Sequence, residues 1–321
     1  MLLTEPDIFS SEAHAQPNIG RAQAKTVTVK ASVVVRTLNE ARYLEELLQG
    51  IAKQEASSLE CEVVLVDSGS TDQTMAIAEN YGCRILHISR EQFSFGRSLN
   101  VGCEAASGDI LVITSGHCVP ASQQWLHNLC QPLIDGVAQY SYGRQLGGPK
   151  NHFSECRVFE KYFPSVSRIP QDGFYCNNAN AALLKSSWAR YRFDEELTGL
   201  EDMHLAQRLV RDGGKVAYVA DASVYHHHSE TWQQVRRRFE REAIALQQIM
   251  PNIHVGLLDT FRYTLRSILR DALHAKRQGL LRKALPSILH YRYNQYLGSY
   301  SGNHEHRQLS RAQKDEYFYP H

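Results

Sequence analysis

Two stretches near the start of the chain decide the fold: SVVVRTLNEARYLEELLQGIA at 32–52 and EVVLVDSGSTDQT at 62–74. Each begins with successive apolar, mostly β-branched residues, becomes polar, and passes into a helical pattern. Such continuous apolar runs are typical of parallel strands buried on both faces. Two more runs follow, at 84–88 and 109–114, with a helical pattern at 96–106 between them. This alternation predicts an α/β fold, a mostly parallel central sheet with helices on both faces.

The composition fits a globular enzyme of ordinary size. The chain has 321 residues, 43% of them hydrophobic, and a formal net charge of +1, so no global charge points to nucleic acid. Its seven cysteines include no CxxC pair, which disfavours a disulfide framework or a thiolate zinc site. The first residues do not read as a signal peptide, and no run reaches the ~18–20 apolar residues that span a bilayer. We therefore expect a cytoplasmic protein.

Changes in composition along the chain predict four segments. Residues 1–28 are polar and predict a flexible extension, 29–230 a catalytic domain, 231–300 a basic helical subdomain, and 301–321 a polar tail. The basic excess in the third segment predicts contact with an acidic surface, either anionic lipid headgroups or a lipid-linked pyrophosphate acceptor. A peripheral position at the inner face of the membrane would follow. A helical cap with an ordinary solvated basic face is the alternative.

Polar residues end three of the predicted strands. They are Arg36-Thr37-Leu38-Asn39-Glu40, then Asp67-Ser68-Gly69-Ser70, then Ser115-Gly116-His117. Ligands of open α/β sheets bind at the carboxyl ends of the strands, so these segments predict a nucleotide-type site. Asp67 could accept hydrogen bonds from a base or a ribose, or it could cap the turn that follows it. We favour a ligand contact for Asp67 and a cap for Asp72.

Six motifs occur in one order along the chain and together resemble a known family. They are VVVRTLNEARYLEELL, VVLVDSGSTDQT, FSFGRSLNVG, ASGDILVITSGHCVP, GLEDMHLAQRL and VYHHHS. This series resembles the family 2 glycosyltransferases, which use the GT-A nucleotide-diphospho-sugar transferase fold, and it covers roughly residues 31–230. The Arg-Thr pair of the first motif resembles the rhamnosyltransferase-like branch.

The resemblance implies a set of residues around a nucleotide-sugar donor. They are Arg36, Thr37, Asn39, Glu40, Asp67, Arg97, Asn100 and His117. An arginine at position 97 could bind a diphosphate through two hydrogen bonds, or it could be a solvent-exposed helix residue. Asn39 could equally be a turn residue or a helix cap.

Histidines stand where the family usually carries a metal-binding Asp-x-Asp motif. This chain has Ser115-Gly116-His117 there, and His226 and His228 lie on one face of a later strand, with His227 pointing away. Imidazole suits Mn²⁺ or another transition ion better than Mg²⁺. We therefore predict a divalent cation, Mn²⁺ or Mg²⁺, held by His117, His226 and His228. A direct phosphate contact without metal, or a surface histidine cluster, is the alternative.

The resemblance places the catalytic acids at Glu201 and Asp202. We expect Asp202 to be the general base and Glu201 to position the acceptor or the loop. The alternative is a pair of acids that stabilises the start of a helix through the macrodipole. Asn177, Asn178 and Asn180 could bind acceptor or sugar hydroxyls, although asparagine is also a common turn residue.

These residues predict an inverting glycosyltransferase. It would move a sugar from a nucleotide-diphosphate sugar to a hydroxyl of a saccharide or lipid-linked acceptor, in bacterial surface polysaccharide or glycolipid synthesis. Two other functions stay open: an inactive scaffold that binds carbohydrate or nucleotide sugar, and a sugar nucleotidyltransferase. The latter would need a glycine-rich basic loop after the first strand, and RTLNEARY is not one.

Overall fold

The computed structural model describes residues 29–55 and 59–304, so the predicted extension at 1–28 and the tail from 305 lie outside the described residues. The elements, in chain order, are β1 (Val29–Thr37), α1 (Ala41–Ala52), β2 (Leu59–Asp67), α2 (Thr74–Asn80), β3 (Arg84–His87), a 3₁₀ turn (Arg90–Gln92), α3 (Phe95–Ala105), β4 (Ile110–Ser115), β5 (Cys118–Pro120), α4 (Trp125–Ile134), β6 (Tyr140–Gly147), α5 (Phe153–Tyr162), β7 (Asn180–Leu184), α6 (Lys185–Tyr191), α7 (Glu201–Arg211), β8 (Val216–His226), α8 (Trp232–Ile249), α9 (Leu257–Arg277) and α10 (Leu281–Asn303).

A single eight-stranded sheet forms the centre of the protein, with the strand order β3-β2-β1-β4-β7-β6-β8-β5. The first four strands of this order are parallel, as the alternating strand and helix patterns predict. Beyond β4 the sheet is mixed: β7 runs antiparallel to both β4 and β6, and β5 runs antiparallel to β8. The parallel half therefore carries the predicted strand ends to one edge, and the mixed half brings later residues beside them.

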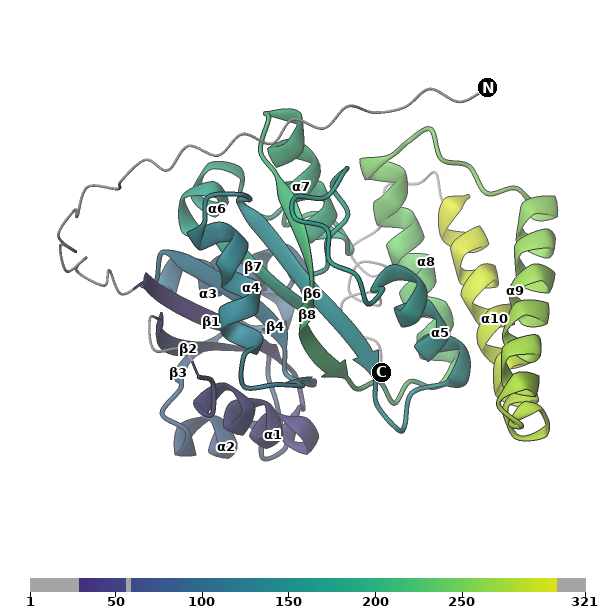
Figure 1. Cartoon of the computed structure of the whole chain (residues 1–321), viewed down its shortest axis with the longest axis horizontal. Helices are drawn as coiled ribbons and strands as arrows, with labels where there is room; N and C mark the ends of the chain where they lie inside the picture. Colours follow the sequence, from purple (N-terminus) through teal and green to yellow (C-terminus); the bar gives the residue numbers. More distant parts are fainter. Residues whose placement is uncertain (1–28, 56–58, 305–321) are drawn as a thin grey trace, which may run out of the picture.

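Helices cover both faces of the sheet (Figure 1). Along β1, Val34 packs with α3, α5, α6 and α7 on one face, whereas Val33 and Val35 pack with α1 and α4 on the other. Successive residues of one strand thus enter two different cores, because side chains alternate across a strand. This explains why the strand sequences contain runs of successive apolar residues, and it confirms the predicted fold class.

The middle of the chain is more regular than its sequence suggests. The segment 147–157, which has a loop-like sequence, contains the first half of helix α5. The segments 215–219 and 222–225, whose sequences look like two short strands, form one strand, β8. Helix α5 begins within the loop-like stretch, and it is held on the sheet by Phe159, which lies in the larger core. Its position depends on distant contacts that no local pattern reveals.

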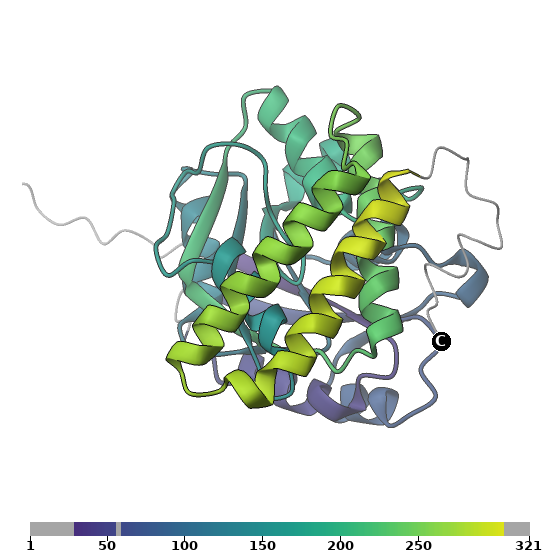
Figure 2. The same cartoon turned by 90° about the vertical axis from the view of Figure 1, so that its right-hand side faces the viewer.

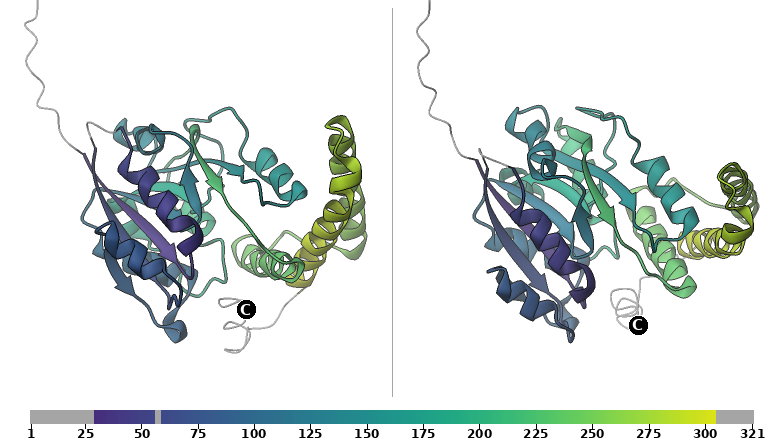
Figure 3. Two further views of the ribbon diagram at one scale, coloured as in Figure 1. Left: turned by 90° about the horizontal axis from the view of Figure 1, so that it is seen from below. Right: turned by 60° about the horizontal axis from the view of Figure 1, so that its bottom comes forward.

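The C-terminal helices form a layer at one end of the protein (Figures 2 and 3). Helix α10 ends at Asn303, slightly beyond the predicted boundary, and packs closely against α8. Gly298 and Gly302 make this approach possible, since a Cβ atom at either position would lie 2.3 Å or less from a backbone oxygen of α8. Within the described residues, no helix combines the length and apolar character needed to cross a membrane.

Asn180, one of the predicted sugar-binding residues, is fully buried at the start of β7. Its Oδ1 accepts a hydrogen bond of 2.9 Å from Trp125 Nε1. Its Nδ2 donates to the backbone oxygens of Arg144 and Ala222, at 3.2 and 2.8 Å. The structure therefore favours a structural role for Asn180, tying α4, β6 and β8 to β7, in place of the predicted sugar contact.

We predict that Asn180→Ala destabilises the fold. It would leave one indole N–H and two carbonyl groups buried without their partner, and each such group costs about 1–3 kcal/mol. Urea unfolding should therefore show a loss of several kcal/mol. Asn177→Ala, in a half-buried position on the same segment, is the matched control and should cost less. Equal, small losses for both variants would contradict the structural role of Asn180.

Candidate active site

The site lies where the carboxyl end of β4 meets that of β1, its parallel neighbour. Gly116 follows β4 directly. A Cβ atom at this position would lie 2.7 Å from Glu40 Cγ and 3.2 Å from Thr37 Cγ2. Only glycine allows the chain to pass so close to the end of β1. The next residue, His117, is thereby brought beside Glu40.

Three histidines meet at this point, each held through its Nδ1 atom. His117 Nδ1 lies 2.7 Å from Glu40 Oε1, His226 Nδ1 lies 2.6 Å from Gln145 Oε1, and His228 Nδ1 lies 2.7 Å from Glu155 Oε1. A carboxylate or an amide oxygen can only accept, so each Nδ1 carries the proton and donates. The lone pair of each neutral ring is then on Nε2.

The three rings offer ligand atoms that all lie within 4.8 Å of one another. The Nε2 atoms of His117 and His226 are only 3.2 Å apart. Two lone pairs at this distance need a proton or a cation between them. Histidines that donate through one nitrogen to a carboxylate or amide, and point the other at a common centre, have the arrangement of metal ligands with their supporting groups. The residues present therefore fit a transition-metal ion.

Burial and neighbouring charges set the protonation of His226 and His117. Burial and the positive charges of His228 and His117 lower the pKa of His226 well below its ordinary value, so this ring is neutral. Burial by itself would also lower the pKa of His117, but the charge and hydrogen bond of Glu40 raise it. His117 is thus the ring that carries a proton when no cation neutralises Glu40.

Behind the histidines lies a second layer of charged groups. Burial by itself would raise the pKa of Glu155, but the hydrogen bond and charge of His228 and the charge of Arg238 lower it. Arg238 Nη2 donates to Glu155 Oε1 at 2.9 Å and to Glu230 Oε2 at 2.7 Å. Glu155, His228 and Glu230 form a second group that could hold a cation. Arg238 occupies this position instead and keeps both carboxylates ionised.

His227 points away from the cluster, as the strand geometry predicts. Its ring stacks on that of Tyr43, with centroids 4.3 Å apart and planes 6° from parallel. It also lies against Gly148, where a Cβ atom would collide with its ring. His227 is therefore a packing residue beside the site.

The acidic pair lies at the start of α7, and both residues are buried. Glu201 Oε1 is 3.5 Å from Arg36 Nη1, so the end of β1 carries the countercharge of the pair. The residue before the helix, Leu200, has φ of 56°. This left-handed conformation is costly for a leucine, and such strain clusters at functional sites. The segment before the helix contains Gly199, but the residue with the left-handed conformation is Leu200.

Asp202 is set up to exchange a proton near neutral pH. Burial and the charge of Glu201 raise the pKa of its carboxyl from 3.8 to about 7. Its oxygens accept hydrogen bonds from the backbone N–H groups of Asn178 and Met203, at 2.8 and 2.7 Å, which partly offset the rise. A carboxylate with a pKa near the working pH is suited to general-base catalysis.

The ends of β1 and β2 are joined by hydrogen bonds between side chains and backbone. Asp67 is buried and accepts from the backbone N–H groups of Gly69 and Ser70, at 3.0 and 3.1 Å, so it closes the turn after β2. Asn39 has φ of 56° and accepts from Thr71 N at 2.8 Å, which makes it a turn residue. Asp72 accepts from the N–H groups of Thr74 and Ala41, as its predicted cap role requires.

Two further residues predicted to bind the sugar donor, Arg97 and Asn100, differ in how exposed their side chains are. Arg97 is half exposed on α3 and lies 3.4 Å from Glu195. Asn100 is buried: its Nδ2 donates to Phe193 O, and its Oδ1 accepts from Trp188 Nε1 and Phe193 N. The structure therefore favours a structural role for Asn100 in place of the predicted donor contact.

Asn177 and Asn178 lie in the turn that faces the acidic pair. The Nδ2 atom of Asn178 is buried and has no hydrogen-bond partner, while its Oδ1 accepts from Tyr140 Oη at 2.5 Å. Asn177 Oδ1 accepts from Gln145 Nε2 at 2.8 Å, which connects this turn to His226 through Gln145. Asn178 thus has a donor available beside Asp202, and Asn177 orients a histidine partner.

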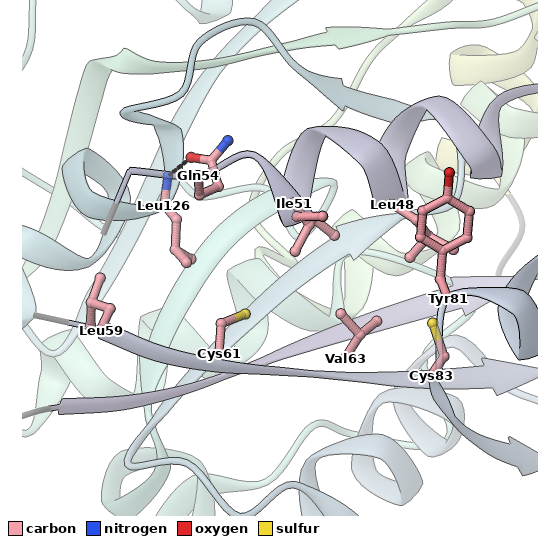
Figure 4. A pocket seen from close by; sticks show the side chains of 10 residues that line it. Leu48, Ile51, Gln54, Leu59, Cys61, Val63, Tyr81, Cys83 and Leu126 are labelled. Carbon is pink, nitrogen blue, oxygen red and sulfur yellow. Dashed lines mark hydrogen bonds between the residues drawn. The ribbon is translucent and has the colours of Figure 1, made fainter. Parts of the chain in front are cut away.

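A separate small cavity of about 280 Å³ lies under α1 (Figure 4). Its walls are mainly apolar, with the thiols of Cys61 and Cys83 and the amide of Gln54 among them. Burial raises the pKa of both thiols to about 11, so they are protonated. None of the residues that line this cavity belongs to the site described above, so we assign it no role in the chemistry.

Gln145, Glu155 and Arg238 belong to the site but do not stand out in the sequence. They lie 81, 73 and 83 residues from their partners, His226, His228 and Glu155, respectively. Their only sequence signal would be polar residues in segments that are otherwise partly apolar, and this signal is weak. Tertiary packing alone identifies them.

Comparison with known sequences agrees with the motif series. The family model described as "Glycosyl transferase family 2" matches residues 32–185. The O-antigen chain rhamnosyltransferase WbaN of Salmonella anatum is 27% identical over 201 residues, 59% of this chain and 63% of that protein. The O-antigen chain rhamnosyltransferase RfbN of Salmonella typhimurium is 25% identical over 228 residues, 66% of this chain and 70% of that protein. The chain thus spans just under two thirds of the first relative. The predicted resemblance, including its branch, is confirmed.

Comparison with solved structures concerns the fold. The mannosyltransferase PcManGT from Pyrobaculum calidifontis, solved in complex with GDP-Man and Mn²⁺, aligns with a TM-score of 0.59 and 19% identity. The alignment covers 86% of this chain and 88% of that protein. At this identity the likeness establishes the GT-A fold and not the ligand.

We predict that Asp202 makes stability depend on pH. Its folded pKa of about 7 exceeds its ordinary 3.8, so between these values the folded protein binds more protons than the unfolded chain. The contribution of this group is fully present below about pH 4 and is lost as the pH rises through about 7. Urea unfolding across this range should show a stability difference between the wild type and Asp202→Asn that changes with pH. Parallel pH profiles for the two proteins would contradict the raised pKa.

Proposed function

We propose that this chain, whose residues 32–185 match the model of glycosyl transferase family 2, is an inverting glycosyltransferase that uses a nucleoside-diphosphate sugar. One observation carries the proposal: the buried acidic pair, in which Asp202 has a pKa of about 7, and the cluster of three oriented histidines both reach the end of strand β1, through Glu201 with Arg36 and His117 with Glu40. A base for the acceptor and a cationic centre for the leaving diphosphate are the two groups that a direct displacement requires.

The donor would lie across the carboxyl ends of β1, β2 and β4. Thr37 and Asp67 would face the nucleoside, and Arg97 could reach the diphosphate if it left Glu195. The half-exposed, acid-paired arginine is suited to such an exchange, because its ion pair is solvated and weak. Two relatives are rhamnosyltransferases, which favours a rhamnose donor, and their O-antigen products favour a role in bacterial surface polysaccharide synthesis.

The acceptor would lie at the start of α7. Asp202 takes the proton of the attacking hydroxyl, and the oxygen then attacks the anomeric carbon on the face opposite the diphosphate. Arg36 lies 3.5 Å from Glu201, and its positive charge partly offsets the rise that burial and Glu201 produce in the pKa of Asp202. Asn178 Nδ2, buried without a partner beside this carboxylate, could donate to a sugar hydroxyl. No covalent intermediate is required.

His117, His226 and His228 would hold a divalent cation, and nitrogen ligands favour Mn²⁺ over Mg²⁺. When bound, such a cation neutralises charge on the diphosphate as the glycosidic bond breaks. Glu40, Gln145 and Glu155 fix the three rings with their Nε2 atoms toward the centre, which prepares the site before any ligand arrives. A cytoplasmic location is part of this proposal, since nucleotide sugars are made there.

We predict that the protein binds Mn²⁺ and that His117→Ala abolishes this binding. Disturbing a residue that supports a metal ligand costs roughly 10–100-fold in affinity, and the loss of a ligand should cost more. His227→Ala is the matched control, because this neighbouring ring stacks on Tyr43 and should leave Mn²⁺ affinity unchanged. Calorimetry or electron paramagnetic resonance measures the binding directly. Unchanged affinity in His117→Ala, or full transfer activity in EDTA, would contradict the metal assignment.

We predict that Asp202→Asn abolishes transfer and leaves nucleotide affinity nearly intact. The amide has almost the same shape but cannot take a proton, and loss of a general base costs ~10²–10⁴-fold in rate. The assay would use folded protein, a panel of nucleotide sugars that includes nucleoside-diphospho-rhamnose, and saccharide acceptors.

Two other substitutions serve as controls for Asp202→Asn. Asp212→Asn, the same chemical change just after the other end of α7, should keep wild-type turnover, because Asp212 pairs with Arg190 at the surface. Glu201→Gln should lower turnover less than Asp202→Asn if Glu201 only positions groups. Wild-type turnover in Asp202→Asn would refute the base assignment and favour a purely structural acidic pair.

A further inference from the structure

We propose that the outward face of the α9–α10 hairpin docks on the surface of an anionic lipid bilayer. We call this face the hairpin face, and define it by Leu257, Phe261, Leu265, Leu269 and Leu273 of α9 with Leu285, Leu289 and Tyr293 of α10. Docking is a property of this surface and does not depend on the proposed transfer reaction.

Exposed apolar side chains gather on this hairpin. Of the nineteen large hydrophobic residues that are exposed in the described parts of the chain, eleven lie between positions 257 and 293. Leu257, Leu258 and Phe261 are each 65–70% exposed. Single exposed apolar residues are ordinary, but a contiguous group marks an interaction site.

The spacing along α9 makes a continuous row. Leu257, Phe261, Leu265, Leu269 and Leu273 recur at every fourth position, and all are exposed. Residues four apart are neighbours on the helix surface, and at 3.6 residues per turn the row winds slowly around the helix. Arg262, Arg266 and Arg270, each three positions before the next leucine of this row, form a second exposed row along its edge. The helix therefore carries an apolar row with a basic row along its edge, the pattern of a helix that lies in a membrane interface.

Helix α10 continues the apolar surface. Leu285, Leu289 and Tyr293 are exposed and again four residues apart. Leu257 and Phe261 of α9 line a groove of about 660 Å³ together with Tyr293 and Leu297 of α10. The opposite sides of the helices are used for packing, where Ala275, Ala284 and Ile288 form a small core. Figure 2 shows both helices of the hairpin at one end of the protein.

The charge around the hairpin face selects the partner. Seven basic residues of the hairpin are exposed: Arg262, Arg266, Arg270, Lys276, Arg277, Arg282 and Lys283. Both acidic residues of the hairpin already have partners. Asp259 accepts a hydrogen bond from Gly256 N at the start of α9, and Asp271 is buried in a 2.7 Å ion pair with Arg292. An anionic bilayer offers both an apolar layer and negative headgroups. A second copy of this chain would bring the same arginine row against itself.

The position of the basic residues corrects the predicted basic segment at 231–300. Arg238, on α8, is turned inward and bonded to Glu155 and Glu230. Most of the exposed basic residues of this segment lie on α9 and α10, while α8 exposes Arg236. Helix α8 thus belongs to the site, and the hairpin beyond it carries the docking surface.

The test uses the full chain and flotation with vesicles of phosphatidylcholine, with or without phosphatidylglycerol, at low and high salt. We expect recovery with anionic vesicles only, and a loss at high salt because salt screens surface charge. Arg262→Gln with Arg266→Gln should weaken the partition roughly 30-fold, since each basic residue contributes about 1 kcal/mol near an anionic leaflet. Leu265→Glu with Leu269→Glu should abolish it.

Val166→Glu is the matched control, because Val166 is 70% exposed and lies outside the hairpin. It should float like the wild type. All substituted positions are exposed, and thermal unfolding would verify that the variants are folded. Equal recovery with neutral and anionic vesicles, or no recovery with either, would overturn the proposal. A wild-type dimer that ignores vesicles and becomes a monomer in Leu265→Glu with Leu269→Glu would assign the hairpin face to self-association instead.

Discussion

Each of the three site histidines donates its Nδ1 proton to an acceptor from a different part of the fold, and the remaining features of the site depend on these bonds. Glu40 precedes α1, Gln145 lies on β6, and Glu155 lies on α5. Because each Nδ1 proton is donated to an acceptor outside the cluster, the Nε2 lone pairs point toward its centre. Their mutual repulsion is tolerable because a cation or a shared proton can sit between them. The cluster is therefore a site prepared by the packing of the whole domain.

The charges around this centre are arranged in two groups that share strand β1. Glu40, just after the strand, faces His117, while Arg36, near its end, faces Glu201. The arginine compensates one carboxylate of the acidic pair and leaves Asp202 buried, with a raised pKa. Arg241 also interacts electrostatically with Glu201, so two arginines share the compensation of this buried acidic pair. The cation-binding histidines and the proposed general base are thus both placed near the end of β1, as a displacement reaction requires.

Helix α8 connects the site to the outer helices. Its Arg238 holds Glu155, which orients His228, while its backbone contacts Gly298 and Gly302 of α10. The hairpin is consequently joined to the active site through α8, and also through α5, where Ser154, next to Glu155, bonds to Asp271 and Arg292. Because a Cβ atom at either glycine would collide with this backbone, the distance between the two layers is fixed by the absence of side chains there. If the hairpin lies on a membrane surface, an acceptor carried by that membrane would meet the active site at a constant distance from the surface.

The sequence by itself determined the parallel half of the sheet, because continuous apolar runs such as 32–35 and 62–67 specify strands buried on both faces, and each is followed by a periodic helix. It also identified His117, His226, His228, Glu201 and Asp202 as candidates, since short motifs retain their residue types. Only the tertiary structure decided the partners of these residues. Gln145 and Glu155 reach the histidines across more than 70 residues of chain, and Asn100 and Asn180 are turned inward, where their amides satisfy buried groups. A local pattern records which face of an element is apolar, but not which distant polar group that face will meet.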